Sequence, residues 1–505
     1  MSSLFEYIEK ENQGRLGAVA VSKGLGGPSL TYSQLFSGIK KISKHFVSGE
    51  IVSVCLDNCI EHAVLFLAVG AAGAVIAPLN PGYTDSEMEF YLKRSPGGLV
   101  VPESAGNAPA ELAANRLGIP VFRISTSPDG KVTLSGKRPT FHGGKSIDDS
   151  FENKTCLILF TSGTTADPKA VPLSHGNLIA SAKNIALTYM LSSSDRTLCI
   201  MPLFHIHGLM ASLVSTLATG GTVVFPSTGK FSANSFLQEL NGSQCTWFSA
   251  VPTMLQIISN ISSVNLTTPH RLRFIRSCSA ALPPTLLEKI EALFSVRVLE
   301  AYAMTEASHQ ITSNPLGDGR RPGTVGLPHG NVQIRIYASN MKIAPHNARG
   351  EVCVKGPSVI KGYLDNPLAN STAFVDGFFR TGDEGFLDKN GFLTITGRLK
   401  ELINKGGEKI SPIEIDTVTL SHPAVAEAVS FGIPDPKYGE TVAVAVVLKA
   451  SKAVTETELS KHIGTKLASF KVPSKIFITD SLLKTATGKV QRRKVAEKFT
   501  HRSKL

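Results

Sequence analysis

The sequence has little of what marks several common classes of protein. Among its 505 residues there is one tryptophan, Trp247, and there are seven cysteines, of which only Cys55 and Cys59 lie close together. An odd number of scattered cysteines provides neither a disulfide framework nor the paired spacing of a zinc site. The cysteine content therefore excludes a disulfide-rich secreted scaffold and suits a reducing compartment.

Long hydrophobic segments are also scarce. The longest apolar stretch, residues 63–79, is short for a membrane span, is rich in alanine and glycine and contains Pro78 near its end. We expect it to form a buried helix that runs into a core strand, and we expect no membrane span. The first fourteen residues contain several acids and lack the apolar segment of a secretory signal.

Acidic residues are fewer than basic ones, 40 against 52, which gives a net charge of +12. A positive field attracts anionic partners such as nucleotides, coenzymes and carboxylates. The basic residues are scattered and no nucleic-acid-binding motif is present, so nucleic acid is not expected as a main partner. The length and the 42% content of hydrophobic residues indicate two or more globular domains.

Two common enzyme motifs are missing as well. No Gly-Lys pair completes the Walker A pattern; the pair Gly144-Lys145 comes closest, but Pro139 stands where the upstream glycine is required. The G-x-S-x-G pattern of serine hydrolases is also absent from the sequence. We therefore expect no P-loop of this type and no covalent serine nucleophile.

The first half of the chain alternates short apolar segments with segments of helical periodicity. The expected strands are β-rich and bounded by turn residues, and one of the helices between them is expected at residues 86–93; the strands are residues 51–55, 75–78, 98–101 and 156–160. Alternation of strands and helices predicts α/β layers with largely parallel sheets.

The pattern changes after residue 350. Segments 350–356 and 391–397, with a turn at residues 389–391, are typical of antiparallel hairpins. After residue 398 the pattern predicts a compact α+β unit. We therefore predict a large N-terminal domain of α/β layers with an added β-rich subdomain, residues 1–397, and a small α+β C-terminal domain, residues 398–505.

A candidate phosphate-binding loop follows the apolar segment 156–160. Residues 161–169, TSGTTADPK, offer small and hydroxyl residues and a lysine directly after an expected buried strand. Backbone N–H groups and hydroxyls in such a loop can converge on phosphate oxygens, and the lysine adds a positive charge. A loop of this composition is often a linker, but its position after a buried strand favours phosphate binding.

This loop resembles the TSGTTGxPKG motif of the adenylate-forming enzymes, which include acyl-CoA synthetases, firefly luciferase and adenylation domains of nonribosomal peptide synthetases. Ala166 and Ala170 replace two glycines of the motif, and Leu483 replaces a proline of the last motif. The other segments that match follow in the family's order: 202–208, 277–281, 302–306, 381–383, 397–400, 406–411 and 484–489. The resemblance implies a carboxylate–CoA ligase with ATP and coenzyme A as substrates, Mg²⁺ as cofactor and a mobile C-terminal domain.

The resemblance also implies a role for each matching residue. Lys489, His205, Thr305 and Glu306 are implied to be catalytic, with Glu306 holding Mg²⁺ and Lys489 bridging the carboxylate and the α-phosphate. Tyr302 would stack on adenine, and Lys400 would be the hinge. The residues implied to bind ATP or coenzyme A are Thr161, Ser162, Gly163, Thr164, Thr165, Lys169, Ser279, Ala280, Glu300, Ala301, Tyr302, Asp383, Arg398, Lys400, Gly406 and Gly407.

The residues say less about the acid. Segment 271–281 ends in polar and cationic residues where an acyl pocket should begin; His205, His207 and His309 could gather there, and Trp247 could close the space. A small dianion needs such donors, whereas a long-chain acid needs an apolar tunnel. Whether Arg276 contacts the acid or is buried scaffolding stays open.

Over nearly the whole chain the sequence looks very like the oxalate–CoA ligases of plants and yeast. This likeness implies oxalate as the acid, with Ser279, His309 and His205 as its binding residues. The alternatives are a ligase for a medium-chain, fatty or aromatic acid, and a nucleotide- or RNA-binding protein without turnover. Residues 503–505, SKL, read as a peroxisomal address for an import receptor, which predicts the peroxisomal matrix, with the cytosol as a second location.

Overall fold

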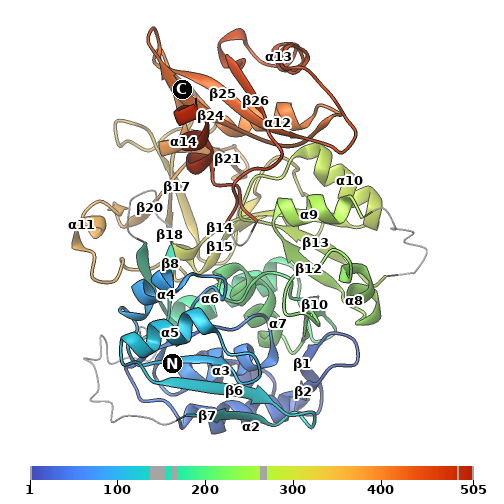
Figure 1. Cartoon of the computed structure of the whole chain (residues 1–505), viewed down its shortest axis with the longest axis vertical. Helices are drawn as coiled ribbons and strands as arrows, with labels where there is room; N and C mark the ends of the chain where they lie inside the picture. Colours follow the sequence, from blue (N-terminus) through green and yellow to red (C-terminus); the bar gives the residue numbers. More distant parts are fainter. Residues whose placement is uncertain (1–2, 137–153, 162–167, 262–269, 486–487, 503–505) are drawn as a thin grey trace.

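The computed structural model describes residues 3–136, 154–161, 168–261, 270–485 and 488–502 (Figure 1). Six residues of the expected phosphate loop, 162–167, which include the predicted site residues Ser162, Gly163, Thr164 and Thr165, lie outside the described residues, as does the tripeptide 503–505. The described chain forms three sheets in its large N-terminal part and one further sheet in its C-terminal part, which lies at the top of Figure 1.

The first sheet is parallel at its centre and antiparallel at both edges. Its strands, in spatial order, are β7 (Val132–Ser135), β6 (Val121–Thr126), β5 (Gly98–Pro102), β3 (Ile51–Val54), β4 (Val75–Pro78), β8 (Thr155–Thr161) and β9 (Lys169–Ser174). All four strands expected in this part of the sequence are present, within one residue at each end.

Helices cover both faces of this sheet. Alternate residues of β5 point to opposite faces, because Val100 packs into one hydrophobic cluster and its neighbours Leu99 and Val101 into another. The first cluster holds α1 (Leu4–Glu11), α2 (Tyr32–Ser43) and α3 (Ile60–Ala71); the second holds α4 (Asp85–Leu92) and α5 (Ala108–Arg116). The apolar stretch 63–79 thus forms the buried α3 and strand β4, as predicted.

The second sheet has nine strands and carries most of the candidate site. In spatial order these are β16 (Leu327–Pro328), β15 (His309–Ser313), β14 (Arg297–Met304), β13 (Phe274–Ser277), β12 (Trp247–Ala250), β10 (Arg196–Leu198), β11 (Thr222–Phe225), β1 (Val19–Lys23) and β2 (Ser29–Thr31). The strands from β14 to β1 run parallel, so their carboxyl ends meet at one edge. Polar residues that follow these strands are thereby brought together.

Two groups of helices flank this sheet. One hydrophobic cluster contains residues of α8 (Phe236–Gly242), α9 (Pro252–Ser259) and α10 (Pro284–Phe294). The central cluster, which also takes in the first sheet, contains residues of α6 (His175–Thr188), the π-helix η2 (His207–Val214) and α7 (Ser215–Ala218). The two sheets therefore share one core. The π-helix η2 is also of interest because π-helical turns are frequent at functional sites.

The third sheet is antiparallel and forms the added β-rich part. Its strands are β17 (Gln333–Tyr337), β18 (Gly350–Lys355), β20 (Phe378–Leu387) and β19 (Phe374–Val375), with β21 (Leu393–Arg398) on β20 and the short α11 (Pro367–Asn370) beside it. The hairpins expected at residues 350–356 and 391–397 are confirmed, and the turn between β20 and β21 includes residues 389–391. Gly391 has a φ of 84°, which favours glycine there.

The C-terminal domain is built on a fourth sheet. Its strands are β23 (Glu408–Ile410), β22 (Ile403–Lys405), β25 (Gly439–Leu448) and β24 (Val425–Asp435), with β26 (Lys475–Ile478) on β25. Its helices are α12 (Pro412–Leu420), α13 (Glu456–Gly464) and α14 (Arg492–Arg502). The α/β fold with a small C-terminal domain agrees with the sequence prediction, while the division at residues 397 and 398 stays a prediction.

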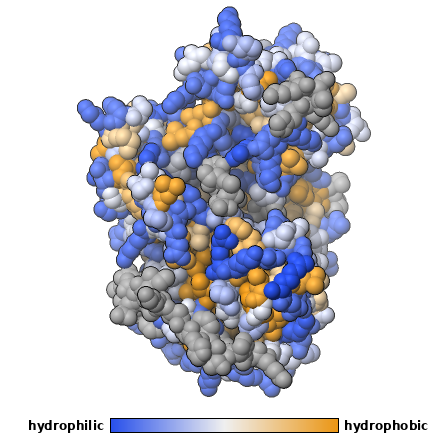
Figure 2. Space-filling view, turned by 60° about the vertical axis from the view of Figure 1, so that its left-hand side comes forward, coloured by the Kyte–Doolittle hydropathy of each residue, from blue (hydrophilic) through white to orange (hydrophobic). Residues whose placement is uncertain are grey.

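Four 3₁₀ turns complete the described elements: η1 (Gln13–Arg15), η3 (Thr305–Ala307), η4 (Leu399–Glu401) and η5 (Ser469–Lys471). Among the helices described, none has both the length and the apolarity that crossing a membrane requires. The space-filling view shows a mostly hydrophilic face on which hydrophobic residues form separate patches (Figure 2).

Candidate functional site

Three residues that are distant in sequence meet at the edge of the second and third sheets. The Tyr302 hydroxyl donates a hydrogen bond of 2.5 Å to Asp383 Oδ2, and Arg398 Nε lies 3.2 Å from Asp383 Oδ1. Asp383 on β20 and Arg398 on β21 are register partners, so the hairpin holds them side by side. Burial, and then the Asp383 charge, raise the pKa of Tyr302, so the ring stays neutral.

Glu306 lies close to this group, on the 3₁₀ turn η3 that follows β14. Its carboxyl is buried and accepts a hydrogen bond of 3.0 Å from the hydroxyl of Tyr363. The loop that carries Tyr363 also contacts η3, because the Ile360 amide donates to the Glu306 carbonyl at 2.9 Å. Burial raises the pKa of Glu306, and the Tyr363 hydrogen bond and the charges of Arg398 and Lys169 oppose that rise.

The two ends of the expected phosphate loop face each other across a strand pair. Thr161 at the end of β8 is the register partner of Lys169 at the start of β9. The ammonium of Lys169 lies 4.4 Å from the centre of the Tyr363 ring, a cation–π contact. The Leu364 amide donates to the Ala170 carbonyl at 3.0 Å, so the base of the loop is joined to the segment that holds Glu306.

Lys489 of the C-terminal domain reaches the same region. Burial, and then the charge of Arg398, lower its pKa, while Asp383 and Glu401 oppose this shift. The charge of Lys489 also acts on His205: burial, and then Lys489, lower the pKa of His205 to about 4. Both side chains are exposed to solvent although protein surrounds them.

Gly488, the residue before Lys489, packs against the large domain. Gly488 has a φ of 82°, and a Cβ there would lie 2.8 Å from Oγ1 of Thr253 on α9. Glycine is therefore required both for the backbone conformation and for the close approach. Within the loop, the Lys489 amide donates to the Thr485 hydroxyl at 3.1 Å, which fixes the backbone that carries the lysine.

The side chains of two histidines and two serines form a polar cluster near His205, referred to as the histidine pocket. The rings of His207 and His309 stack with their centres 4.8 Å apart. His207 Nδ1 lies 3.1 Å from Ser279 Oγ, and His207 Nε2 lies 2.6 Å from Ser249 Oγ. Burial, and then the charges of Arg276 and His205, lower the pKa of His207, so its ring is neutral. These contacts bring His207 and His309 together, while His205 is near enough for its charge to act on His207.

Arg276 lies behind this pocket and has no exposed surface. Its Nε donates to the Tyr189 hydroxyl at 2.7 Å, and its Nη1 to the Ser249 hydroxyl at 3.2 Å. Nη2 lies 3.4 Å from Gln310 Oε1, and Nη1 lies 3.4 Å from His207 Nε2. The guanidinium is thus held by neutral polar groups and contacts the histidine pocket through Ser249 and His207.

Trp247 is one residue for which the expectation is wrong. Its side chain is fully buried and stacks on Phe274, with the ring centres 5.3 Å apart. It lies 6.5 Å from the ring of Tyr189. Because no part of the indole reaches accessible space, Trp247 supports the pocket from behind and does not itself close it.

The remaining predicted residues lie in two parts of the chain, residues 280–305 and residues 400–407. Thr305 begins η3, Ala280 follows Ser279, and Glu300 and Ala301 are buried on β14 next to Tyr302. Lys400 lies on η4, after Arg398. Gly406 and Gly407 form the turn between β22 and β23, and the Gly406 amide donates to the Tyr438 carbonyl at 2.8 Å. This turn packs within the C-terminal domain, on another element from Lys489.

Among the predicted residues, Glu306 is suited to bind Mg²⁺. In the part of the chain that the structure describes, no cluster of three or more His, Cys, Asp or Glu residues forms a metal cage. Glu306 provides a single carboxylate whose burial is costly without a cation. Mg²⁺ is commonly bound by one or two carboxylates with the rest of its ligands from phosphate oxygens and water. The residues therefore suit a metal that arrives with a nucleotide.

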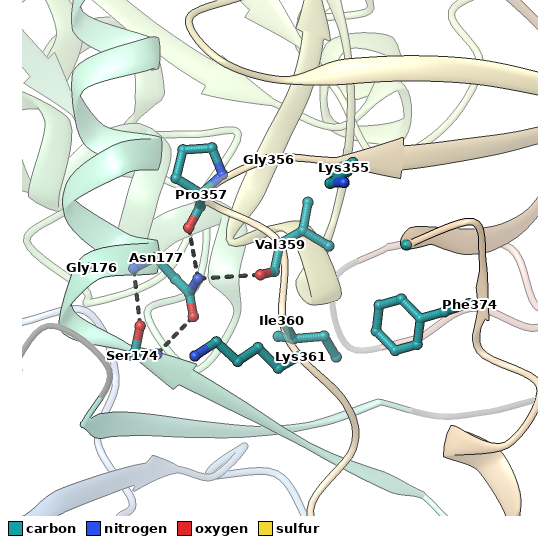
Figure 3. Close-up of a pocket in the computed structure, with 11 residues that line it drawn as sticks. Ser174, Gly176, Asn177, Lys355, Gly356, Pro357, Val359, Ile360, Lys361 and Phe374 are labelled. Atoms are coloured by element: carbon teal, nitrogen blue, oxygen red, sulfur yellow. Dashed lines mark hydrogen bonds between the residues drawn. The ribbon is translucent and has the colours of Figure 1, made fainter. Parts of the chain in front are cut away.

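A surface pocket of about 450 Å³ borders the site at Ile360, whose amide contacts Glu306 (Figure 3). It is formed mainly by the start of α6 and by the segment after β18. Between them, the side-chain amide of Asn177 donates to the carbonyls of Pro357 at 2.7 Å and Val359 at 3.3 Å. None of its described lining residues is among those expected to bind ATP.

Several residues of the site could not be selected from the sequence. Tyr363, Ser249, Tyr189 and Gln310 match no motif used above, and each is brought in by a strand or loop far along the chain. The only signal for Ser249 was its place in the segment around Trp247. The other three carry no signal in composition or spacing.

Comparison with known proteins agrees with this arrangement. The family described as AMP-binding enzyme matches residues 8–364, and the AMP-binding enzyme C-terminal domain matches residues 414–489. The chain is 44% identical to the oxalate–CoA ligase of Arabidopsis thaliana over 99% of this chain and 98% of that one. It is 43% identical to the oxalate–CoA ligase of Saccharomyces cerevisiae, over 90% and 88%.

A solved structure agrees over the same length. ATP-bound MatB from Rhodopseudomonas palustris superposes with a TM-score of 0.87 and 28% identity over 99% of both chains. The family match covers more than half of the chain, and the two curated relatives extend over nearly all of it. The chain therefore belongs to the AMP-binding enzyme family.

Proposed function

We propose that this chain is an ATP-dependent acid–CoA ligase that converts oxalate to oxalyl-CoA through an acyl-adenylate. The observation that carries the proposal is the position of Lys489. The charge of Lys489 lowers the pKa of His205 at the acid pocket. The charges of Arg398 and Asp383, two residues proposed to bind the nucleotide, in turn shift the pKa of Lys489. A cation between an acid pocket and a nucleotide site is placed to bring two anions together.

In the first half-reaction, a carboxylate oxygen of the acid attacks the α-phosphorus of ATP. A new phosphorus–oxygen bond forms, the bond to the β-phosphate oxygen breaks, and pyrophosphate leaves. Both reactants are anions, so the enzyme must neutralise and position charge. Lys489 and Lys169 supply positive charge, and the Mg²⁺ held through Glu306 neutralises phosphate oxygens when it is bound.

In the second half-reaction, the sulfur of coenzyme A attacks the carbonyl carbon of the adenylate. The carbon–sulfur bond forms, the thiol proton is released, and AMP leaves. Lys489 is not needed for this step. The C-terminal domain turns about Lys400 and replaces Lys489 with another face, which includes the turn of Gly406 and Gly407, a domain movement of a common kind.

The nucleotide-binding roles form part of the same proposal. Tyr302 stacks on adenine beside Ser279, Ala280, Glu300 and Ala301. Asp383 and Arg398 bind the ribose, which is supported by the ion pair that already orients the carboxylate. Thr305, with the loop Thr161, Ser162, Gly163, Thr164 and Thr165, binds the phosphates.

The acid pocket favours a small, doubly charged acid. Its described groups are the imidazoles of His205, His207 and His309 and the hydroxyl of Ser279, with the buried charge of Arg276 behind them. These groups donate hydrogen bonds and provide no apolar tunnel for an alkyl chain. The names of the Arabidopsis and yeast relatives support the choice of oxalate.

A panel of carboxylates tests this function. Purified protein is mixed with ATP, Mg²⁺, coenzyme A and one acid, and pyrophosphate release and the acyl-CoA product are both measured. We expect oxalate to be used in preference to malonate, acetate, octanoate and coumarate. Preferred turnover of octanoate or coumarate would contradict oxalate and support a medium-chain or aromatic ligase. Nucleotide binding without pyrophosphate release for any acid would overturn the ligase itself.

The location of the enzyme is a separate proposal. If Leu505 is the last residue of the protein, residues 503–505 are read by the peroxisomal import receptor. A fluorescent protein fused to the amino terminus is then expected to collect in peroxisomes. Deletion of residues 503–505 is expected to leave the fusion in the cytosol, and unchanged peroxisomal import would contradict the proposal.

A further inference from the structure

Arg276 is a buried cation without a carboxylate partner among the described residues. It has no exposed surface, and none of its described hydrogen-bond partners is a carboxylate; they are Tyr189, Ser249, Gln310, His207 and the Cys278 thiol. A buried charge that lacks an opposite charge costs several kcal/mol in general. An arginine in this position is therefore poorly explained as scaffolding alone, and it lies directly behind the pocket assigned to the acid.

The hydrogen bonds that lead away from Arg276 have a fixed direction. Arginine has only donors, so the Ser249 oxygen accepts from Nη1 at 3.2 Å. The proton of the Ser249 hydroxyl remains available for donation, and His207 Nε2 lies 2.6 Å from its oxygen. A second donor, Arg276 Nη1, lies 3.4 Å from the same nitrogen, so Nε2 cannot carry a proton.

The same reasoning identifies the donor in the next hydrogen bond, between His207 and Ser279. Because His207 Nε2 accepts, the ring proton is on Nδ1, and Nδ1 donates to Ser279 Oγ at 3.1 Å. Ser279 has then filled one acceptor position, and its hydroxyl proton remains available for a donor bond to another group. Ser279 is only half-buried and its φ is 73°, so it lies where the chain turns at the pocket.

His309 adds a second polar atom to the same place. Its ring stacks on that of His207, and its Nε2 is buried without a hydrogen-bond partner among the described residues. A buried polar nitrogen is normally satisfied. A ligand oxygen beside His309 would supply the missing partner.

We propose that Arg276 is a positioning residue that selects a dicarboxylate: it fixes the chain Arg276, Ser249, His207, Ser279 so that Ser279 donates to the second carboxylate of the acid, and its charge offsets that carboxylate. This inference rests on the proposed acid–CoA ligase function. It predicts that Arg276 distinguishes a dianion such as oxalate from a monoanion such as acetate.

The test compares two acids in three proteins. kcat and KM are measured for oxalate and for acetate, and KM is measured for ATP, in wild type, Arg276→Gln and Arg276→Lys. We expect Arg276→Gln to lower kcat/KM for oxalate about tenfold or more, because a charged hydrogen-bonding group is lost. The value for acetate and the KM for ATP should change little. Arg276→Lys, which keeps the charge, should recover part of the loss.

A binding measurement separates recognition from turnover. Trp247, the single tryptophan, packs beside Tyr189, whose hydroxyl accepts from Arg276. Its fluorescence therefore reports on this pocket, and titration with oxalate in the absence of ATP gives a dissociation constant. We expect weaker oxalate binding in Arg276→Gln and no change in Arg271→Gln, an exposed arginine near the start of the same segment that serves as the matched control.

The outcomes separate the inference from the function. If wild type uses oxalate and folded Arg276→Gln keeps the oxalate-to-acetate ratio, the inference is overturned and the ligase function stands. If wild type uses no dicarboxylate, the choice of acid fails and the inference fails with it. If Arg276→Gln does not fold, Ser249→Ala replaces it, because this change interrupts the chain and leaves the arginine in place. An unchanged ratio in Ser249→Ala would then overturn the inference.

Discussion

The hydroxyl of Tyr363 donates a hydrogen bond of 3.0 Å to Glu306 Oε1, across 57 residues of sequence. The tyrosine is itself held by its ring, which contacts the ammonium of Lys169 at 4.4 Å. This places the residue proposed to hold Mg²⁺ and the lysine at the base of the phosphate loop on one aromatic side chain. Tyr363 therefore orients Glu306 and does not need to contact the substrate.

Removal of this hydroxyl tests the relationship. In Tyr363→Phe the ring remains and the hydrogen bond to Glu306 is lost, a net cost of about 1 kcal/mol. We expect the Mg²⁺ concentration for half-maximal adenylate formation to rise about fivefold, while KM for the acid stays unchanged. Mg²⁺-dependent ATP binding, measured by calorimetry, should weaken by a similar factor.

The matched control is Tyr337→Phe. Tyr337 also donates to a carboxylate, Asp376, at 2.8 Å, but it lies on β17 in the outer part of the third sheet. We expect this variant to keep the Mg²⁺ dependence of wild type. Equal shifts in both variants would mean that the effect comes from a general loss of stability.

Asp383, which is proposed to bind the ribose of ATP, gives a second prediction. Asp383 accepts from Tyr302 and pairs with Arg398, so Asp383→Asn leaves both partners in place but removes the charge. We expect KM for ATP to rise about tenfold, because a charge-assisted contact becomes a neutral one. KM for the acid should change less, and both are measured by pyrophosphate release. The control is Asp388→Asn, an acid paired with Arg321 at the end of the same hairpin.

Lys489 separates the two half-reactions. In Lys489→Ala we expect adenylate formation to fall by two or more orders of magnitude, in the range found when a single charge-stabilising group is removed. Transfer of a supplied acyl-adenylate to coenzyme A should stay close to wild type. Lys484→Ala, which removes a lysine that pairs with Glu427 at 2.7 Å in the same loop, is the control. Equal loss of both half-reactions in Lys489→Ala would contradict the proposed domain alternation.

Local pattern was sufficient for much of the fold. Four strands of the first sheet and the buried helix α3 were predicted from short apolar segments bounded by turn residues, because such segments are stable only as covered strands or helices. The family was also predicted correctly from the order of its motifs, and the comparisons confirm it. Lys169 was assigned because it follows a strand within a single loop.

The rest of the site depends on contacts that sequence spacing does not encode. Glu306 and Tyr363 meet only because the loop after β18 returns to η3. Trp247 was placed wrongly although it lies on the same face of β12 as Ser249, since residues two apart on a strand point to the same side. Trp247 lies at the start of the strand, where Phe274 and Tyr189 pack on the indole, whereas Ser249 lies nearer the end of the strand and contacts His207. A pattern of residues thus indicates which strand reaches the site, but the packed partners decide which side chain faces it.

The last prediction concerns Glu300, which was expected to contact nucleotide and is buried on β14. Burial raises its pKa from 4.5 to about 7, and a hydrogen bond of 3.1 Å from the Gly323 amide opposes the rise. Its folded-state pKa lies above the unfolded value, so the native protein keeps a proton that the unfolded chain loses. Wild-type stability therefore falls as the pH rises from about 4.5 to about 7 and stays lower above that.

Glu300→Gln cannot ionise and should not show this loss. We expect its Tm, relative to wild type, to be several degrees higher at pH 8 than at pH 5, because the ionisation of Glu300 costs up to about 3 kcal/mol. Thermal unfolding at the two pH values measures the difference, and Glu103→Gln, at an exposed site, should change little at either pH. If Glu300→Gln instead has the same effect at both pH values, the native protein does not keep the proton on Glu300, and the prediction is wrong.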